Sequence, residues 1–351
     1  MSTNDQAKPV FLPLGVASPE EPVGYVADLT SGIDALDLLT GEPLWRVPFV
    51  ARPVLVFENL LVTVRPVQDR TNVLQFIVLD RNKKGDLLLE SDSLVFPDWV
   101  RANISQDESF SYRISVEQND LLLQWSARAR YKGGASPSAR ILEQSTQDAA
   151  GIARFNFRTG EVRELPVLAE EKIELPDILR GASLFSYRQG ASSVWHTEPW
   201  AFDGKFAVVI GEVLDDAQTL KLQKWDAQTG ESDQPVSLIT GQALVSYVTP
   251  DGLFLFLNSE IESNDNKHDW WLFSVSTGKE LAVLNYEDGT REACVVNSTV
   301  YFLVEDPPSP LRIGGETVQL ILKAVDLTSG KLLWERLLSV QSSKKRTALR
   351  Q

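Results

Sequence analysis

Short apolar runs alternate with polar pairs along this chain, and the pattern predicts antiparallel β-hairpins. Residues 54–64 place Glu58 and Asn59 between two apolar runs, and residues 200–210 have the same pattern around an Asp-Gly pair. Two-residue polar turns between runs rich in Val, Leu, Ile and Phe favour hairpins. Three further segments follow the same pattern: 114–125, 248–257 and 293–303. The hydrophobic pattern therefore predicts an all-β fold.

A turn motif follows these hairpins and recurs through the chain. Its two best copies run from Ala35 to Trp45 and from Ala324 to Trp334, and they read A-x-D-x-x-T-G-x-x-x-W with Ser replacing Thr in the second. An Asp at the start of such a turn accepts hydrogen bonds from backbone N–H groups two or three residues further on. The glycine supplies the positive φ that the turn needs, and the Trp buries a large flat face against a neighbour.

Weaker copies lie between these two, and each keeps the glycine. One copy has Asn156 in place of the Asp, another has Ser274, and a third carries an extra residue before Gly85. The residues that we assign to turn formation and blade packing are Asp37, Gly41, Trp45, Gly85, Asn156, Gly160, Asp226, Gly230, Gly278, Asp326, Gly330 and Trp334. We interpret the acidic members as turn formers and not as catalytic bases.

The spacing of the motif glycines predicts the architecture. Most intervals are roughly 40–50 residues, which is the length of a four-stranded propeller blade. Two longer intervals hold insertions, which we expect at 92–110, 132–150 and 168–192. The chain is therefore predicted to form a single closed β-propeller of six four-stranded blades, with seven blades as the alternative if an insertion contains strands.

The two ends of the chain compete for completing the ring. We expect residues 1–8 to be a flexible N-terminus, residues 9–341 to be the propeller and residues 342–351 to be a flexible basic tail. Either the apolar segment 10–14 or the basic tail can supply a strand to the first blade. A ring that stays open leaves sheet edges unpaired.

Composition places the chain among ordinary globular proteins. Of its 351 residues, 43% are hydrophobic and 23% are charged, and the formal net charge is −14. An acidic surface repels nucleic acid and anionic membranes on average. The start of the chain has no apolar stretch of signal-peptide length, and no segment has the roughly 20 apolar residues of a membrane helix. We therefore expect a cytoplasmic protein that neither binds nucleic acid nor inserts into a membrane.

The turn motif resembles the blade signature A-x-D-x-x-T-G-K-x-x-W of β-propellers built from pyrroloquinoline-quinone-type (PQQ-type) repeats, the quinoprotein-like propellers. The resemblance spans essentially the whole chain and is specific for the fold, but such propellers serve many roles. For the enzymes of this family it implies an export signal, calcium, the quinone, a catalytic Asp and often two adjacent cysteines. This chain has one cysteine, Cys294, and six repeats where those enzymes use eight. We therefore expect no cofactor and no enzymatic activity.

The residues themselves give no catalytic or metal-binding set. The two histidines, His196 and His268, lie in different blades, whereas zinc sites take several Cys or His ligands. Loop 262–269 offers oxygen ligands of the kind that calcium prefers, but it lacks the EF-hand spacing. Cys294 lies in an apolar strand, where a thiol is expected to be buried and inert. We assign no catalytic, cofactor-binding or metal-binding residue.

One segment is a candidate docking strip for an acidic partner. In residues 125–132, alternation places Trp125 and Tyr131 on one face of a strand, and three basic side chains on the other. The residues proposed to bind the partner are Arg128, Arg130, Tyr131 and Lys132. The alternative is a solvated strand face whose arginines pair with nearby carboxylates.

The predicted function is a non-enzymatic scaffold that binds other proteins in a cytoplasmic complex. Binding residues concentrate on loops that a rigid scaffold holds, so we expect the three insertions to face the partner. Four alternatives remain open. The chain is similar to the lipoprotein propeller of the outer-membrane barrel assembly machinery, and to propellers of bacterial three-part systems with a MoxR-type ATPase and a von Willebrand A protein. The other two are a small-ligand sensor using the central channel and a PQQ-dependent dehydrogenase.

Overall fold

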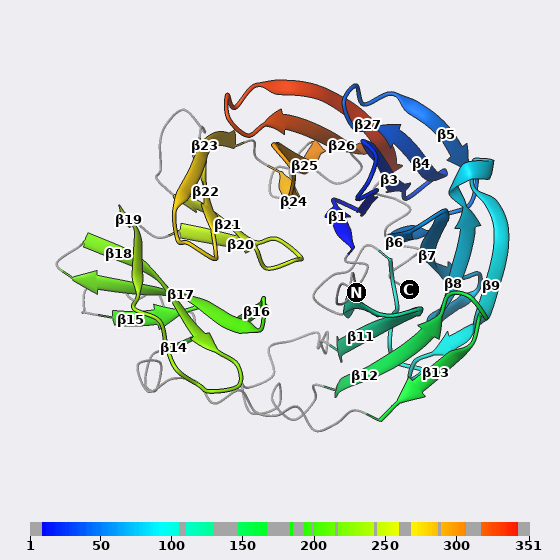
Figure 1. Ribbon diagram of the computed structural model, residues 1–351, viewed down its shortest axis with the longest axis horizontal. Coiled ribbons are helices and arrows are strands. Elements are labelled where there is room, and N and C mark those ends of the chain that lie inside the picture. The colour runs from blue at the N-terminus through cyan, green and yellow to red at the C-terminus, as the bar shows by residue number, and fades with distance from the viewer. Residues whose placement is uncertain are drawn as a thin grey trace, which may run out of the picture. The chain divides into compact units, whose positions relative to one another are not determined.

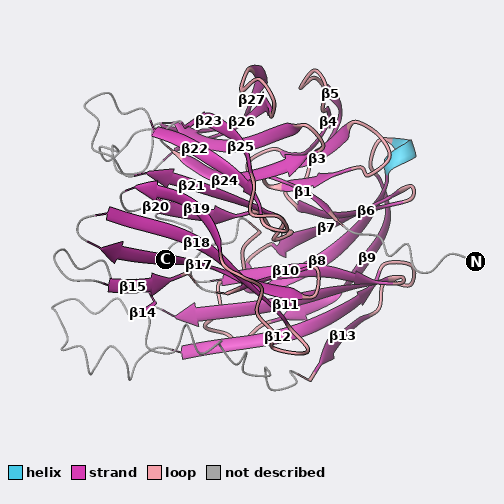
Figure 2. Cartoon of the chain, turned by 60° about the vertical axis from the view of Figure 1, so that its left-hand side comes forward, coloured by secondary structure: helices cyan, strands magenta, loops and turns pink. Residues whose placement is uncertain are grey.

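The computed structural model is almost entirely β-structure. It describes residues 9–104, 110–129, 147–166, 183–184, 193–197, 199–214, 217–241, 244–259, 268–286, 289–306 and 317–342. In these ranges the one helical element is the short 3-10 helix Arg81–Lys83, which is cyan in Figure 2. This helix accommodates the extra residue that the sequence shows before Gly85, with Lys84 at φ 56°. None of the described helical residues forms a helix that is long and apolar enough to cross a membrane.

The strands form six sheets, numbered one to six in chain order (Figure 1). Sheet one is β1 (Val10–Leu12), β2 (Gly15–Ala17), β3 (Val23–Asp28), β4 (Gly32–Asp37) and β5 (Pro43–Val47). Sheet two is β6 (Arg52–Phe57), β7 (Leu60–Val67), β8 (Arg70–Asp80) and β9 (Asp86–Val95). Sheet three is β10 (Phe110–Glu117), β11 (Asp120–Ala129), β12 (Gln147–Asn156) and β13 (Val162–Leu165).

Sheet four is β14 (Ser183–Leu184), β15 (Ser193–His196), β16 (Trp200–Phe202), β17 (Lys205–Leu214), β18 (Ala217–Asp226) and β19 (Val236–Gly241). Sheet five is β20 (Leu244–Val248), β21 (Phe254–Ser259), β22 (His268–Ser274) and β23 (Glu280–Tyr286). Sheet six is β24 (Thr290–Val296), β25 (Thr299–Asp306), β26 (Thr317–Asp326) and β27 (Leu332–Ser342). These sheets are the blades of a six-bladed β-propeller, which confirms the predicted fold class.

Two sheets have more than the four strands that the sequence predicted. Sheet one has five, because the N-terminal strand Val10–Leu12 pairs with β2. Sheet four has six, and two of them are halves of one interrupted strand, since β15 and β16 both pair with β17. The interruption falls at 197–199, where Pro199 has no N–H to give to the ladder. The Thr197 hydroxyl accepts a hydrogen bond from Val209 N at 3.0 Å and so replaces a backbone acceptor.

The predicted insertions were wrong at their edges. The expected insertion 92–110 overlaps two strands, because β9 continues to Val95 and β10 begins at Phe110. The expected insertion 132–150 includes the start of β12, and 168–192 includes β14. The polar run at the start of β12 reads as a loop, yet it continues the ladder to β11, with Asp148 opposite Arg128. The rest of the last two insertions lies outside the described residues, as do 1–8 and 343–351.

The chain divides into two compact units. The first holds Met1–Glu170 with Gly314–Ile321 and Arg336–Gln351, and the second holds Glu171–Ile313 with Leu322–Glu335. The last strand, β27, therefore begins in the second unit and belongs to the first from Arg336 onwards.

Within each unit, apolar cores lie between consecutive sheets. Tyr25 and Ile33 of sheet one share a cluster with Val56 and Ile77 of sheet two. A second cluster joins sheets two and three, where the rings of Phe76 and Phe155 stack with centroids 4.5 Å apart. In the second unit, comparable clusters join sheets four and five, and five and six. Sheets two and five have such a cluster on both faces, which explains why their strands read as apolar runs and not as strict alternation.

Candidate functional site

The motif turns are closed by their own side chains. The Asp37 carboxylate accepts a hydrogen bond from Leu39 N at 2.7 Å, and Gly41 N donates to the Asp37 carbonyl at 2.8 Å. The hydroxyl of Thr40 accepts from Glu42 N at 3.3 Å. Corresponding bonds form at Asn156, Asp226, Ser274 and Asp326. The polar atoms of these side chains are therefore used in hydrogen bonds that close the turns.

These hydrogen bonds also shift the acidity of two turn carboxylates. The backbone N–H groups of Thr229 and Gln228 hold the pKa of Asp226 below its ordinary value. The hydroxyl and N–H of Ser329 do the same for the pKa of Asp326. A donated hydrogen bond favours the ionised form, so neither group is poised as a general base near neutral pH.

The motif glycines have left-handed backbone, and some of them allow close contact between consecutive blades. All of them have positive φ: Gly41 75°, Gly85 85°, Gly160 85°, Gly230 71°, Gly278 69° and Gly330 66°. In the first unit, a Cβ at Gly85 would lie 2.4 Å from Val47 Cγ2 and 2.8 Å from Trp45 Cζ3 of the preceding blade. In the second, a Cβ at Gly278 would lie 2.6 Å from Val236 Cγ1. At these positions glycine serves both the turn and the packing of the next sheet against it.

The predicted docking strip falls partly within the described residues. Arg128 lies on β11 with its side chain 64% exposed, and its Nε donates to Asp148 Oδ1 at 3.1 Å. The alternation that the sequence predicted is present, because Ala127 is buried while Ser126 and Arg128 are exposed. Exposed pairs of this kind contribute little to stability. The other three strip residues, Arg130, Tyr131 and Lys132, lie outside the described part of the chain, so the strip stays a prediction.

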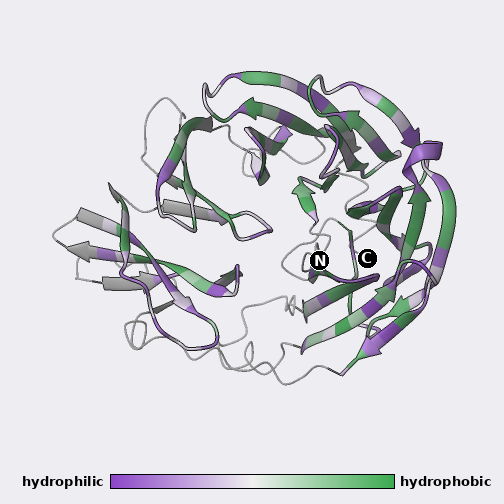
Figure 3. Ribbon diagram, viewed as in Figure 1, coloured by the Kyte–Doolittle hydropathy of each residue, from purple (hydrophilic) through white to green (hydrophobic). Residues whose placement is uncertain are grey.

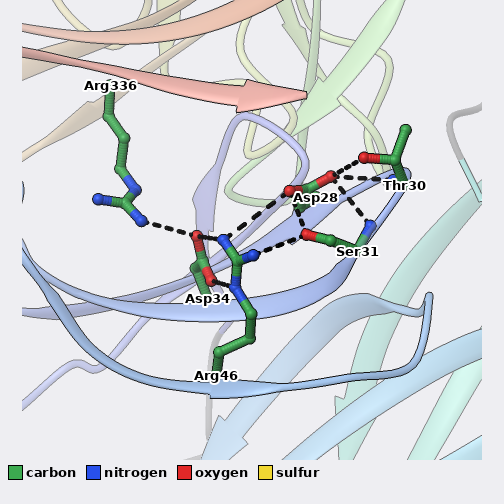
Figure 4. A network of polar contacts seen from close by, with 6 residues as sticks. All are labelled: Asp28, Thr30, Ser31, Asp34, Arg46 and Arg336. Carbon is green, nitrogen blue, oxygen red and sulfur yellow. Dashed lines mark hydrogen bonds and ion pairs between the residues drawn. The ribbon is translucent and has the colours of Figure 1, made fainter. Parts of the chain in front are cut away.

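A buried ion network lies in the first unit (Figure 4). The Asp34 side chain on β4 is 1% exposed, and Arg46 of β5 binds both of its oxygens, through Nε to Oδ1 and through Nη2 to Oδ2 at 2.8 Å. Arg336 of β27 donates its Nη2 to the same Oδ2 at 3.0 Å. Asp34 and Arg46 are direct register partners in the sheet. One buried carboxylate therefore receives two guanidinium groups from distant parts of the sequence.

A second carboxylate steadies this network. Asp28, at the end of β3, accepts hydrogen bonds from Thr30 N at 2.9 Å and Thr30 Oγ1 at 2.8 Å. Ser31 Oγ donates to Asp28 and accepts from Arg46 Nη1 at 2.9 Å. Arg46 is thus held by Asp34 and Ser31, with Asp28 also within 3.8 Å of its Nη2.

The network sets the charge state of Asp34. Burial alone would raise the pKa of this carboxyl, but hydrogen bonds and charges from Arg46 and Arg336 outweigh burial and hold the pKa below its ordinary value of 3.8. The carboxylate is therefore ionised at neutral pH and acts as a structural anchor.

A recurring set of exposed leucines was not found from the sequence. Leu44, Leu88, Leu281 and Leu333 occupy the same position after the motif glycine, and they are 49%, 48%, 43% and 51% exposed. In sheets one, two and five the register skips this residue, so Leu44, Leu88 and Leu281 are β-bulges on the last strands of their blades. The signal in the sequence is the Leu that directly precedes the motif Trp in both best copies.

Neighbouring leucines extend this feature. Leu87 and Leu332 directly precede Leu88 and Leu333, and each of them is 53% exposed. Figure 3, in the view of Figure 1, shows the apolar stretch on β9. The matching positions of sheets three and four carry Arg163 and Asp233 instead. We call Leu44, Leu88, Leu281 and Leu333, which share the position three residues after the motif glycine, the bulge leucines.

The other side chains that the sequence offered for chemistry, a histidine and the cysteine, are buried in the fold. His196 is buried, with Nδ1 2.8 Å from the Thr197 carbonyl oxygen. Cys294 is 2% exposed within β24. Among the residues that the structure describes, no group of three or more His, Cys, Asp or Glu side chains is placed to hold a metal ion.

Comparison with known proteins gives structural likenesses at low identity. No family model matches the chain, and no curated protein matches it. BamB from Moraxella catarrhalis is 14% identical, with 83% of this chain and 81% of that chain covered and a TM-score of 0.34. Hsv2 from Kluyveromyces lactis is 9% identical, with 92% and 96% covered and a TM-score of 0.33. The quinohemoprotein alcohol dehydrogenase ADHIIG from Pseudomonas putida HK5 is 11% identical, with 90% and 57% covered and a TM-score of 0.28. Identities of this size assign no activity, substrate or partner.

Proposed function

We propose that this protein is a non-enzymatic scaffold that binds another protein through the bulge leucines on the outer strands of its blades. The main support for this proposal is that an exposed leucine recurs at one position in four of the six blades. Single exposed apolar residues are ordinary on protein surfaces, but a bulge re-aims a side chain and is a specific feature of a strand. A partner that makes the same contact on several blades needs the same side chain at the same position of each blade.

The hydrogen bonds of the carboxylates described above support a scaffold in place of an enzyme. The motif carboxylates Asp37, Asp226 and Asp326 are engaged in turns, and the buried carboxylate Asp34 is engaged by two arginines. Each of these groups already has hydrogen-bond donors that satisfy it. A rigid set of sheets with outward-facing side chains is suited to presenting a surface.

The partner that fits best is a protein with an apolar surface bordered by basic groups. The formal net charge of −14 repels a second copy of the chain, as it repels nucleic acid, and attracts a basic partner. Acidic residues adjoin the leucines: Asp86 precedes Leu87 directly, and Glu280 precedes Leu281. Apolar contact would supply the affinity, and charge would supply the steering.

The test uses the full chain, tagged, with capture from native cells followed by purification of the captured protein. With the purified partner, Leu88→Ser and Leu333→Ser should each weaken binding by about tenfold, the loss typical of a buried apolar anchor. Arg163→Ser, at the matching position of sheet three, is the control and should leave affinity unchanged. Equal affinity for wild type and both leucine variants would overturn the proposed surface.

Two further arms separate the alternatives. Deleting 133–146, which leaves β12 intact, tests whether the predicted insertion, and not the leucines, captures the partner. Sedimentation of the purified chain tests for a second copy, and a leucine-dependent dimer would overturn the choice of a different protein. Dye reduction on adding quinone and calcium would overturn the non-enzymatic assignment.

A further inference from the structure

We propose that Asp34, Arg46 and Arg336 form a latch that fastens the C-terminal part of β27 to the first sheet, and that this part opens locally when Arg336 lets go. Asp34 and Arg336 are 302 residues apart in the chain. Both belong to the first compact unit, which takes in the chain again from Arg336 onwards. The argument for the latch does not rest on the proposed binding surface.

Backbone pairing does not make this connection. Sheet one is built only from strands between Val10 and Val47, and sheet six only from strands between Thr290 and Ser342. Among the described strands, β27 pairs within sheet six and lies at its end, so no shared ladder ties it to β4. Any contact between β27 and β4 is then made by side chains. The Asp34–Arg336 contact is such a side-chain connection.

The two arginines hold Asp34 unequally. Arg46 is its register partner, binds both carboxylate oxygens and has a further bond to Ser31. Arg336 gives a single hydrogen bond to Oδ2 at 3.0 Å, and its own Nε is buried without a hydrogen-bond partner. A bidentate pair is stronger and more directional than a single bond. Arg46 is therefore the strongly bound partner of Asp34, and Arg336 is the partner that dissociates when the latch opens (Figure 4).

Release leaves no orphaned anion behind. When Arg336 withdraws, the buried Asp34 carboxylate keeps Arg46, so the main penalty of an unpaired buried charge is avoided. Arg336, whose side chain is 20% exposed, gains water on leaving. Opening is thus confined to β27 after Glu335, while the first sheet keeps its own network. This asymmetry makes the contact a local switch and not merely part of the core.

Hydrogen exchange on the full-length chain, read by mass spectrometry, tests the latch. Arg336→Gln should speed exchange about 10- to 100-fold in peptides covering residues 336–342, the range expected for losing a hydrogen bond to a charged group. Peptides covering β3 and β4 should exchange as in the wild type. Glu335→Gln is the matched control, because the side chain of this neighbour is 56% exposed and pairs only with Lys323 at 3.5 Å, and it should change neither region.

Two more variants test the roles of the two arginines separately. Arg46→Gln should speed exchange both in β3 and β4 and in residues 336–342, since it removes the strongly bound partner of Asp34. Arg336→Lys keeps the charge without the planar fork and should give an intermediate rate in 336–342, which serves if the Gln variant does not fold. Wild-type exchange of 336–342 in a folded Arg336 variant, or equal acceleration by Glu335→Gln, would overturn the latch.

Discussion

The rings of Tyr25 and Trp45 lie 5.6 Å apart although a whole strand separates them. Ala35 of β4 is the register partner of both, with Tyr25 on one side and Trp45 on the other. Since neighbouring strands are about 4.8 Å apart, two large rings can meet across a third residue only if that residue is small. Tyr301 and Trp334 repeat the contact at 5.8 Å in the other strong copy, where Ala324 is fully buried. This contact explains the Ala of the A-x-D motif.

Enlarging that alanine should separate the rings. Ala35→Leu is expected to lower the free energy of unfolding by about 1–3 kcal/mol, because added bulk in a packed core forces strain. Denaturant unfolding measures the change. Leu39→Ala, at a side chain that is 72% exposed, is the control and should be nearly neutral. An unchanged midpoint for Ala35→Leu would contradict the role given to this alanine.

Two glycines with similar φ separate turn strain from packing. Gly85 has φ 85° and Gly204 has φ 73°, but a Cβ would lie 2.4 Å from Val47 Cγ2 at the first and would meet nothing within 4 Å at the second. Gly204→Ala should therefore cost only the left-handed strain, about 1–2 kcal/mol. Gly85→Ala should cost about 1–3 kcal/mol more, because the blades must also move apart. Equal losses in denaturant unfolding would show that packing plays no part at Gly85.

The Asp34 network makes stability depend on acidity. Because its pKa is lower in the folded chain than in the unfolded one, the carboxylate stabilises the fold fully above the unfolded value and loses this effect as pH falls through the folded value. Asp34→Asn should cost about 3 kcal/mol at pH 7. The difference between wild type and variant should shrink below about pH 4, as urea unfolding at several pH values will measure. A difference that grows on acidification would contradict this assignment.

Tyr301 is expected to make stability fall in alkali. Burial raises its pKa from 10.0 to about 12. The neutral phenol is thus favoured in the folded chain, so its contribution is intact below about pH 10 and is lost between the unfolded and folded pKa values. Absorbance titration of phenolate should show a tyrosine ionising near pH 12 that Tyr301→Phe removes. A titration identical for the two proteins would count against it.

The motif turns were predictable because their bonds are local. Asp37 is hydrogen-bonded to groups two to five residues away, so the residue order alone specifies the turn and the hairpin that follows. The same local logic gave six blades from six glycines. It left β1 as one of two alternatives for the first blade, and it missed β2, a run of three residues that is too short to show a period, and the interrupted strand at Pro199. It also misread the start of β12, where polar residues form a strand because β11 pairs with them.

The amino-acid order by itself determined the hairpins and the positive-φ glycines, because each depends on atoms a few residues apart, and the spacing of the glycines favoured six blades over seven. Tertiary structure decided which side chains meet. It places Gly85 against Val47 and Arg336 against Asp34, and it turns the bulge leucines outward. Such contacts join residues from different blades or depend on a register shift between strands, and neither the spacing nor the type of a residue specifies its partner until the sheets are packed.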